Sequence, residues 1–204
     1  MDAYSYLVRG HVFANAQTGN IILLGVNLAN GDISVASRYL LPILAFTLGI
    51  IISDMINRRK SFIKIHWRQI SVLIEAIILL IVAFLPYSQN SFANIITSLA
   101  CGIQLETFRK IHGNVVATTM CIGNLRSGTY NMENYIKTNE KDFLRRALIY
   151  YGVIIAFVIG AVIESFLVKS TGRQGILLSA FALIIAFILM FQDNSKSEKV
   201  KNLN

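Results

Sequence analysis

Amide and hydroxyl side chains gather in two short segments of this otherwise apolar chain. Residues 13–20 read FANAQTGN and precede an aliphatic run, and residues 114–125 read NVVATTMCIGNL. Such donors and acceptors at membrane depth can bind a neutral or zwitterionic solute, or line the narrow part of a pore. The candidate substrate-binding residues are Asn15, Gln17, Thr18, Asn20, Asn114, Thr118, Thr119 and Asn124.

The alternative role for these two polar segments is packing. Small and hydroxyl-bearing residues also join helices within membranes. Irregular backbone at that depth occurs only where protein or water covers it, because unsatisfied polar groups are costly in hydrocarbon. The residues alone leave both interpretations open.

One carboxyl group lies in the middle of an apolar run. Glu75 occurs within SVLIEAII, and a charged residue at that depth costs roughly 2.5–3.5 kcal/mol on insertion scales. Such groups usually face the interior of a helix bundle, so we take Glu75 as a candidate for proton coupling. A hydrogen-bonded, protonated carboxyl is the structural alternative. Asp2 is a second candidate, since it precedes the first polar segment as Glu106 precedes the second.

Other reactive residues form no recognisable constellation. The three histidines, His11, His66 and His112, are dispersed, and Cys101 and Cys121 match no metal or redox spacing. The sequence contains no phosphate-binding loop, dinucleotide-binding fingerprint or nucleophile elbow. We therefore expect no metal, no cofactor and no enzymatic activity.

Composition indicates a membrane protein. Hydrophobic residues make up 54% of the chain and charged residues only 15%, whereas a soluble domain has roughly a quarter charged. Several windows of about twenty residues carry almost no charge, which is the length that crosses a bilayer. A soluble helical bundle is disfavoured because these runs lack a polar face. The net charge of +8 lies in short loops and the tail, which indicates cytoplasmic loops rather than nucleic-acid binding.

The predicted fold is all-α, a bundle of six to seven transmembrane helices. Residues 1 to about 10 resemble the end of a helix whose beginning is missing, and the two polar segments are expected to be broken or re-entrant. A charged cytoplasmic tail, predicted to be disordered, occupies residues 193–204. The predicted full spans are residues 36–57, 67–86, 92–108, 143–168 and 174–192.

The two halves of the chain, residues 1–88 and 89–192, match in order. AFTLG at residues 45–49 resembles AFVIG at residues 156–160, and an Arg-Gln pair opens a helix in each half. The matches predict an internal repeat of three plus three helices. With six spans and inverted halves, the basic loops and the C-terminus all lie in the cytoplasm. A seven-span arrangement, with one polar segment crossing, remains the alternative.

Several of these residues resemble the YoaK family. They are the DAYSY sequence at residues 2–6, ANAQTGN at 14–20, IEA at 74–76, GIQ at 102–104 and NVVATT at 114–119. The resemblance implies a multi-pass protein of the bacterial inner membrane with a domain of unknown function, and it implies no substrate. Family members usually have a longer N-terminus, and their second block often ends in Thr-Gly-Thr instead of Ile-Gly-Asn.

The functional prediction is a small-solute transporter or channel-like permease of the bacterial cytoplasmic membrane. The alternative is a non-transporting protein that acts in membrane assembly or interacts with lipid. The expected partners are the lipid bilayer and an unidentified small solute, with no nucleic acid and with a homo-oligomer left open.

Overall fold

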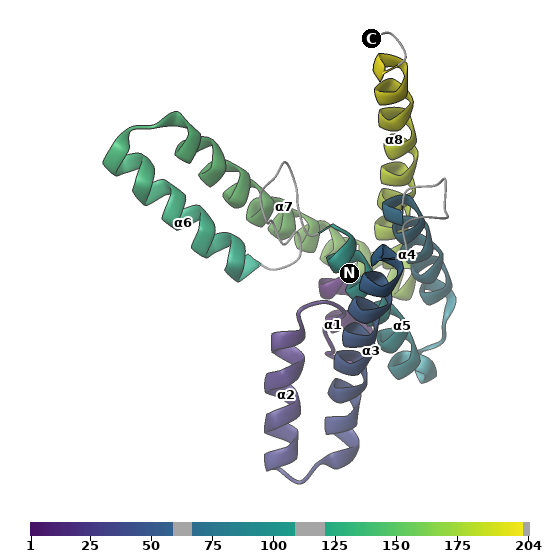
Figure 1. The fold of residues 1–204 in the computed structure, drawn as a ribbon. Coiled ribbons are helices and arrows are strands. Elements are labelled where there is room, and N and C mark those ends of the chain that lie inside the picture. The colour runs from purple at the N-terminus through teal and green to yellow at the C-terminus, as the bar shows by residue number, and fades with distance from the viewer. Residues whose placement is uncertain (59–66, 109–120, 202–204) are drawn as a thin grey trace.

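The described residues fold mainly into α-helices. The computed structural model describes residues 1–58, 67–108 and 121–201, with side chains up to residue 190 (Figure 1). The all-α prediction is confirmed for this part of the chain. The helices are α1 (Asp2–Val8), α2 (Gln17–Ala29), α3 (Ile33–Arg58), α4 (Trp67–Phe84), α5 (Asn90–Thr107), α6 (Cys121–Thr138), α7 (Lys141–Thr171) and α8 (Leu177–Lys201), with the short 3-10 helices η1 (Tyr87–Gln89) and η2 (Gly172–Ile176).

Three segments of the described chain are long and apolar enough to cross a membrane. They are Ile33–Ile56, Trp67–Phe84 and Lys141–Met190, the last of which includes both α7 and α8. Their outward faces carry large apolar side chains, such as Phe166 at 66% exposure. Exposed apolar surface on this scale is favourable against lipid and unfavourable against water. The helices therefore have the exterior of a membrane protein.

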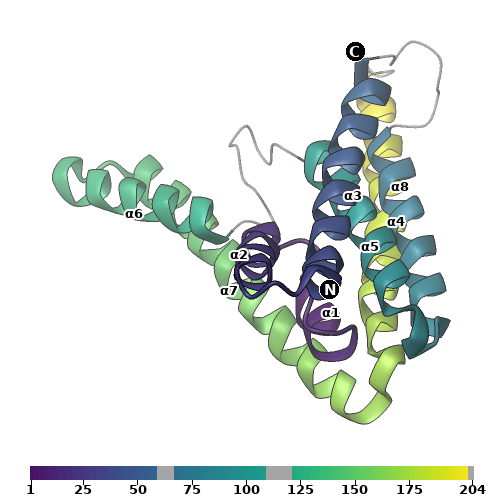
Figure 2. The same ribbon diagram turned by 90° about the horizontal axis from the view of Figure 1, so that it is seen from below.

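The helices form a bundle from which two hairpins extend. Helices α3, α4, α5 and α8 run side by side, with α5 packed on α3 and α4, and α8 packed on α4 (Figure 2). Helix α2 folds back along α3, and α6 folds back along α7 (Figure 1). Helix α1 packs against α7. The turn between α2 and α3 uses Gly31 with φ of 78°, as the Asn-Gly-Asp sequence predicts.

The first polar segment interrupts the helical structure, as predicted. Helix α1 ends at Val8 and α2 begins at Gln17, so the connection between them contains the start of this segment. At the other end of the chain, α8 continues to Lys201, past the predicted start of disorder at Asp193. The residues after Asp193 include several lysines and a glutamate, which are good helix formers and can extend an existing helix.

Two glycines let α3 and α5 touch along their backbones. A Cβ atom on Gly49 would overlap the Leu99 carbonyl oxygen, and one on Gly102 would overlap the Phe46 carbonyl oxygen. Both obstacles are main-chain atoms in neighbouring helices, so no side chain can move aside. Close helix contact at small residues is typical of membrane proteins.

We expect Gly49→Ala and Gly102→Ala each to destabilise the protein by about 1–3 kcal/mol, because the added methyl forces the two helices apart. Apparent melting temperatures of the purified variants in detergent measure the effect. Gly152→Ala and Gly160→Ala are matched controls, since no atom lies within 4 Å of a Cβ placed at either position. Equal stability of the two pairs of variants would contradict the close crossing.

Candidate functional site

The most unusual polar group in the bundle is the carboxyl of Glu75. It lies near the middle of α4 and is only 1% exposed. Neither carboxyl oxygen has a hydrogen-bond partner among the described residues. Helix α4 buries Val72, Ala76 and Leu79 on the same side. Glu75 therefore faces the interior of the protein and not lipid, in a position where a charge is strongly disfavoured unless something compensates it.

Three parts of the chain come within contact or electrostatic range of Cys101. The Cys101 thiol of α5 is buried, and the carboxyls of Glu75 and Asp2 both lie close enough to act on it electrostatically. Cys101 also packs against Ala14 and Phe46 in one apolar cluster. The two predicted proton-coupling candidates and the first polar segment are thus brought to one region of the bundle.

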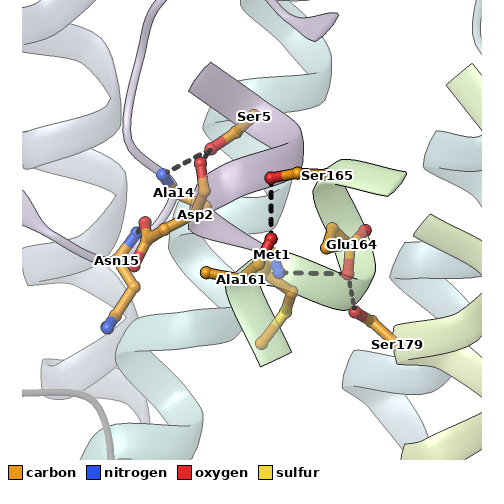
Figure 3. Close-up of polar contacts among 9 residues, drawn as sticks. All are labelled: Met1, Asp2, Ser5, Ala14, Asn15, Ala161, Glu164, Ser165 and Ser179. Atoms are coloured by element: carbon orange, nitrogen blue, oxygen red, sulfur yellow. Dashed lines mark hydrogen bonds and ion pairs between the residues drawn. The ribbon is translucent and has the colours of Figure 1, made fainter. Parts of the chain in front are cut away.

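Asp2 fixes the chain that leads into α2. Its Oδ1 atom accepts hydrogen bonds from the backbone N–H groups of Asn15 (2.8 Å) and Ala16 (3.2 Å). The Ser5 hydroxyl accepts another from the N–H of Ala14 at 3.0 Å (Figure 3). Backbone N–H groups at the start of a helix lack partners within it, and a carboxylate is stabilised there. Asp2 therefore has a structural role at the start of α2.

The amides of the first polar segment bond mainly within the segment. Asn20 is 0% exposed, and its Nδ2 donates to the Phe13 carbonyl (2.7 Å) and to Gln17 Oε1 (2.9 Å). Its Oδ1 accepts from the Phe13 N–H at 2.9 Å, and Gln17 Nε2 donates to the Ala14 carbonyl at 3.0 Å. Asn15 is buried, whereas Thr18 is exposed. Solute binding by these four residues stays a prediction.

The second polar segment is described only in part. Asn114, Thr118 and Thr119 lie outside the described residues, and Asn124 is buried on α6. The thiol of Cys121, at the start of α6, lies within electrostatic reach of Asp2. The first turn of α6 thus approaches the region where α2 begins. A shared cavity lined by Asn20 and Asn124 stays a prediction.

A cluster of hydroxyl groups lies one turn along α4 from Glu75. The Thr107 hydroxyl of α5 is 3.2 Å from Ser53 Oγ of α3 and 3.2 Å from Ser71 Oγ of α4. The indole of Trp67 donates to Ser53 at 3.3 Å. We call Ser53, Ser71 and Thr107 the hydroxyl cluster. Since Ser71 and Glu75 are four residues apart, they share one face of α4.

Sequence analysis did not select the hydroxyl cluster. Serine and threonine are common in membrane helices, where their hydroxyls often bond to the preceding turn, as Thr107 does to the Ile103 carbonyl at 2.7 Å. Only the packing of α3, α4 and α5 shows that these three hydroxyls meet. Gln69 adds a buried amide to this end of α4, and its Nε2 has no hydrogen-bond partner within the described residues.

Sequence analysis also missed Arg9, which is 1% exposed. Its guanidinium donates to the carbonyl oxygens of Val82 and Leu85, to the Asn90 side chain and to the Tyr4 hydroxyl. The carbonyls at the end of a helix lack partners within it and carry partial negative charge, which a cation stabilises. Arg9 thereby joins the first connection to the end of α4. The signal available in the sequence was a single arginine between the first helical stretch and the polar segment.

A second buried carboxyl, Glu164 of α7, differs from Glu75 because its Oε2 atom has partners, although its Oε1 atom has no hydrogen-bond partner among the described residues. Its Oε2 accepts a hydrogen bond from the Ser179 hydroxyl at 2.9 Å and lies 3.7 Å from the Met1 nitrogen (Figure 3). This contact joins α7 to α8. Glu164 therefore serves as an internal comparison for the Glu75 carboxyl.

The helices expose large apolar side chains on their outer faces and bury a carboxyl between them. These features define an integral membrane protein of the helical-bundle class. The family model described as "Protein of unknown function (DUF1275)" matches residues 1–189, and the chain belongs to this family. The predicted resemblance is thereby confirmed.

A curated relative supports the same class. The chain is 27% identical, over 170 residues, to the UPF0700 transmembrane protein YoaK of Bacillus subtilis (strain 168). The match covers 80% of this chain and 76% of that protein. No solved structure shows a significant match.

Proposed function

We propose that this protein is a proton-linked transporter of small neutral or zwitterionic solutes, with Glu75 as the residue that binds and releases the proton. The observation that carries the proposal is a carboxyl buried at the middle of α4 with no hydrogen-bond partner among the described residues. Ionisable groups within membrane spans commonly belong to proton or substrate pathways. A purely structural carboxyl would be expected to have at least one hydrogen-bond partner, as Glu164 has through its Oε2 atom.

The hydroxyl cluster lies between Glu75 and one end of the bundle, where it could serve as a path for protons. Hydroxyl groups both donate and accept hydrogen bonds, so a chain of them can pass a proton along. The cluster occupies the interface of α3, α4 and α5 between Trp67 and the turn that carries Glu75. We infer that protons reach Glu75 from this end.

The solute would bind near the first turns of α2 and α6. The start of a helix carries partial positive charge, which suits the carboxylate of a zwitterionic solute. Asp2, which lies at the start of α2 and near Cys121 of α6, suits its ammonium group. Asn15, ahead of α2, and Asn124, in the first turn of α6, would supply amides. The proposal needs no cofactor and includes no enzymatic activity.

We further propose six spans arranged as two inverted repeats, residues 1–88 and 89–192. In this arrangement α1, α2, α3 and α4 correspond to α5, α6, α7 and α8. The packing of α5 on α3 then has its counterpart in the packing of α1 on α7. The α2–α3 hairpin corresponds to the α6–α7 hairpin, and α4 packs on its own counterpart α8. The three candidate spanning segments include neither α5 nor α6, so the count of six spans rests on the correspondence between the two halves.

The topology predicts that Lys60 and Lys141 both face the cytoplasm, because basic loops are retained on that side. Lys60 lies outside the described residues. Single cysteines at these positions, in a chain whose Cys101 and Cys121 are replaced by alanine, should react with an impermeant thiol reagent only after the cells are opened. Labelling of either cysteine from outside intact cells would contradict the six-span topology.

The transport proposal is tested with purified protein in liposomes that contain a pH-sensitive dye. We expect at least one compound from a panel of common amino acids, glycine betaine and neutral sugars to acidify the liposome interior when added outside. Protein-free liposomes and a protonophore are the controls. A folded protein that moves no proton with any member of the panel would overturn the proposal and favour the non-transporting alternative.

A further inference from the structure

A groove of about 440 Å³ lies between α6 and α7, away from Glu75. It is formed where α6 ends and α7 begins, on the hairpin that extends from the bundle (Figure 1). Its lining residues are Tyr135 from α6 and Lys141, Leu144, Arg145, Leu148 and Ile149 from α7. No step of the proposed transport uses this groove.

The cationic part of the groove is free to bind an anion. Lys141 and Arg145 are four residues apart, so both side chains lie on the same face of α7. Neither forms an ion pair with any residue that the structure describes. By contrast, Lys137 of α6 lies outside the groove and pairs with Glu133 at 2.6 Å. The acidic neighbours Glu140 and Asp142 do not line the groove.

The rest of the groove is apolar and open. Leu144, Leu148 and Ile149 continue along α7 from the two cations, and Leu148 is 59% exposed. A ligand that covers this surface must therefore carry negative charge at one end and an apolar chain at the other. A free phosphate or a soluble anion would leave the leucines uncovered.

The position of the groove also matches the edge of a bilayer. Lys141 is the first residue of the candidate spanning segment Lys141–Met190, so the cations lie where the apolar segment begins. Lysine, arginine and tyrosine are favoured at this level because their polar ends reach the headgroups. Basic pockets between helices at this level bind anionic lipid headgroups.

We propose that this groove binds an anionic phospholipid of the surrounding membrane. The lipid phosphate lies between Lys141 and Arg145, and the Tyr135 hydroxyl is available to donate a hydrogen bond to it. One acyl chain covers Leu144, Leu148 and Ile149. The lipid would hold the α6–α7 hairpin at a fixed depth, whether or not the protein transports a solute.

Native mass spectrometry of the full chain in detergent tests this site, with phosphatidylglycerol and phosphatidylcholine titrated separately. The double variant Lys141→Gln/Arg145→Gln should lose about thirtyfold in affinity for phosphatidylglycerol, because each basic residue near a membrane surface contributes roughly fivefold. Tyr135→Phe should lose only a few-fold. Binding of phosphatidylcholine should be weaker and unchanged in all variants.

The matched control is Arg126→Gln/Arg146→Gln, which removes the same charge from α6 and α7 outside the groove. It should retain the affinity of the unmodified protein for phosphatidylglycerol. Unchanged affinity of the groove variant would overturn the proposal. Equal losses in the two double variants would also overturn it, because they would show charge attraction without a site. Unchanged helix content by circular dichroism establishes that each variant is folded.

Discussion

Glu75→Gln should abolish solute accumulation driven by a pH gradient while leaving the protein folded. A gradient of about one pH unit supplies about 1.4 kcal/mol per proton, so coupling one proton to one solute supports roughly tenfold accumulation. Glutamine has nearly the same shape as glutamate but cannot release a proton. We therefore expect the accumulation ratio to fall from about ten to one. Uptake of a solute identified in liposomes measures the effect.

The control for this variant is Glu164→Gln, which changes the other buried carboxyl in the described part of the bundle. Glutamine can still accept the hydrogen bond that Ser179 donates, so accumulation should persist. Loss of accumulation in both variants would indicate a general disturbance of the bundle. Full accumulation in Glu75→Gln would remove Glu75 from the mechanism.

Replacing Glu75 with an apolar residue should raise the stability of the protein. Because the carboxyl has no hydrogen-bond partner among the described residues, Glu75→Met should stabilise the protein by about 1–3 kcal/mol while abolishing accumulation. A higher apparent melting temperature in detergent measures this gain. A large loss of stability would instead indicate that Glu75 is a structural group.

Arg9→Met should have the largest effect on folding. The substitution preserves much of the apolar stem but removes every hydrogen bond to the end of α4, including those to the Val82 and Leu85 carbonyls. Those carbonyls would then remain buried without their donor. We expect a loss of about 3–5 kcal/mol, which for a marginally stable protein removes most of the folded population. The yield of monodisperse protein after solubilisation measures it.

Two further substitutions make the Arg9 prediction specific. Arg9→Lys should recover only part of the yield, because an ammonium group cannot reproduce the planar arrangement of guanidinium donors. Arg38→Met removes the same charge from an exposed position on α3 and should leave the yield unchanged. Normal yield of Arg9→Met would show that the guanidinium contacts contribute little to folding.

The sequence by itself determined the class of protein and the positions of its helices. Apolar runs of about twenty residues predict spanning helices because each backbone polar group in hydrocarbon must be satisfied within its own segment. This requirement is local, so α3, α4, α5 and α7 begin and end within a few residues of their predicted limits. A break near the first polar segment was also predicted, but the structure places it at residues 9–16, and the cluster of amides, hydroxyl and glycine at residues 17–20 lies within α2.

The tertiary structure alone decided which polar residues meet. Arg9 reaches carbonyls more than seventy residues away, and Thr107 joins serines from two other helices. Gly49 and Gly102 acquire their role only where α3 crosses α5. Each of these residues has an ordinary local sequence, because its partner is supplied by another helix and not by its neighbours. Glu75 could be singled out by its depth in an apolar run, but its burial within electrostatic range of Cys101 depends on how the helices pack.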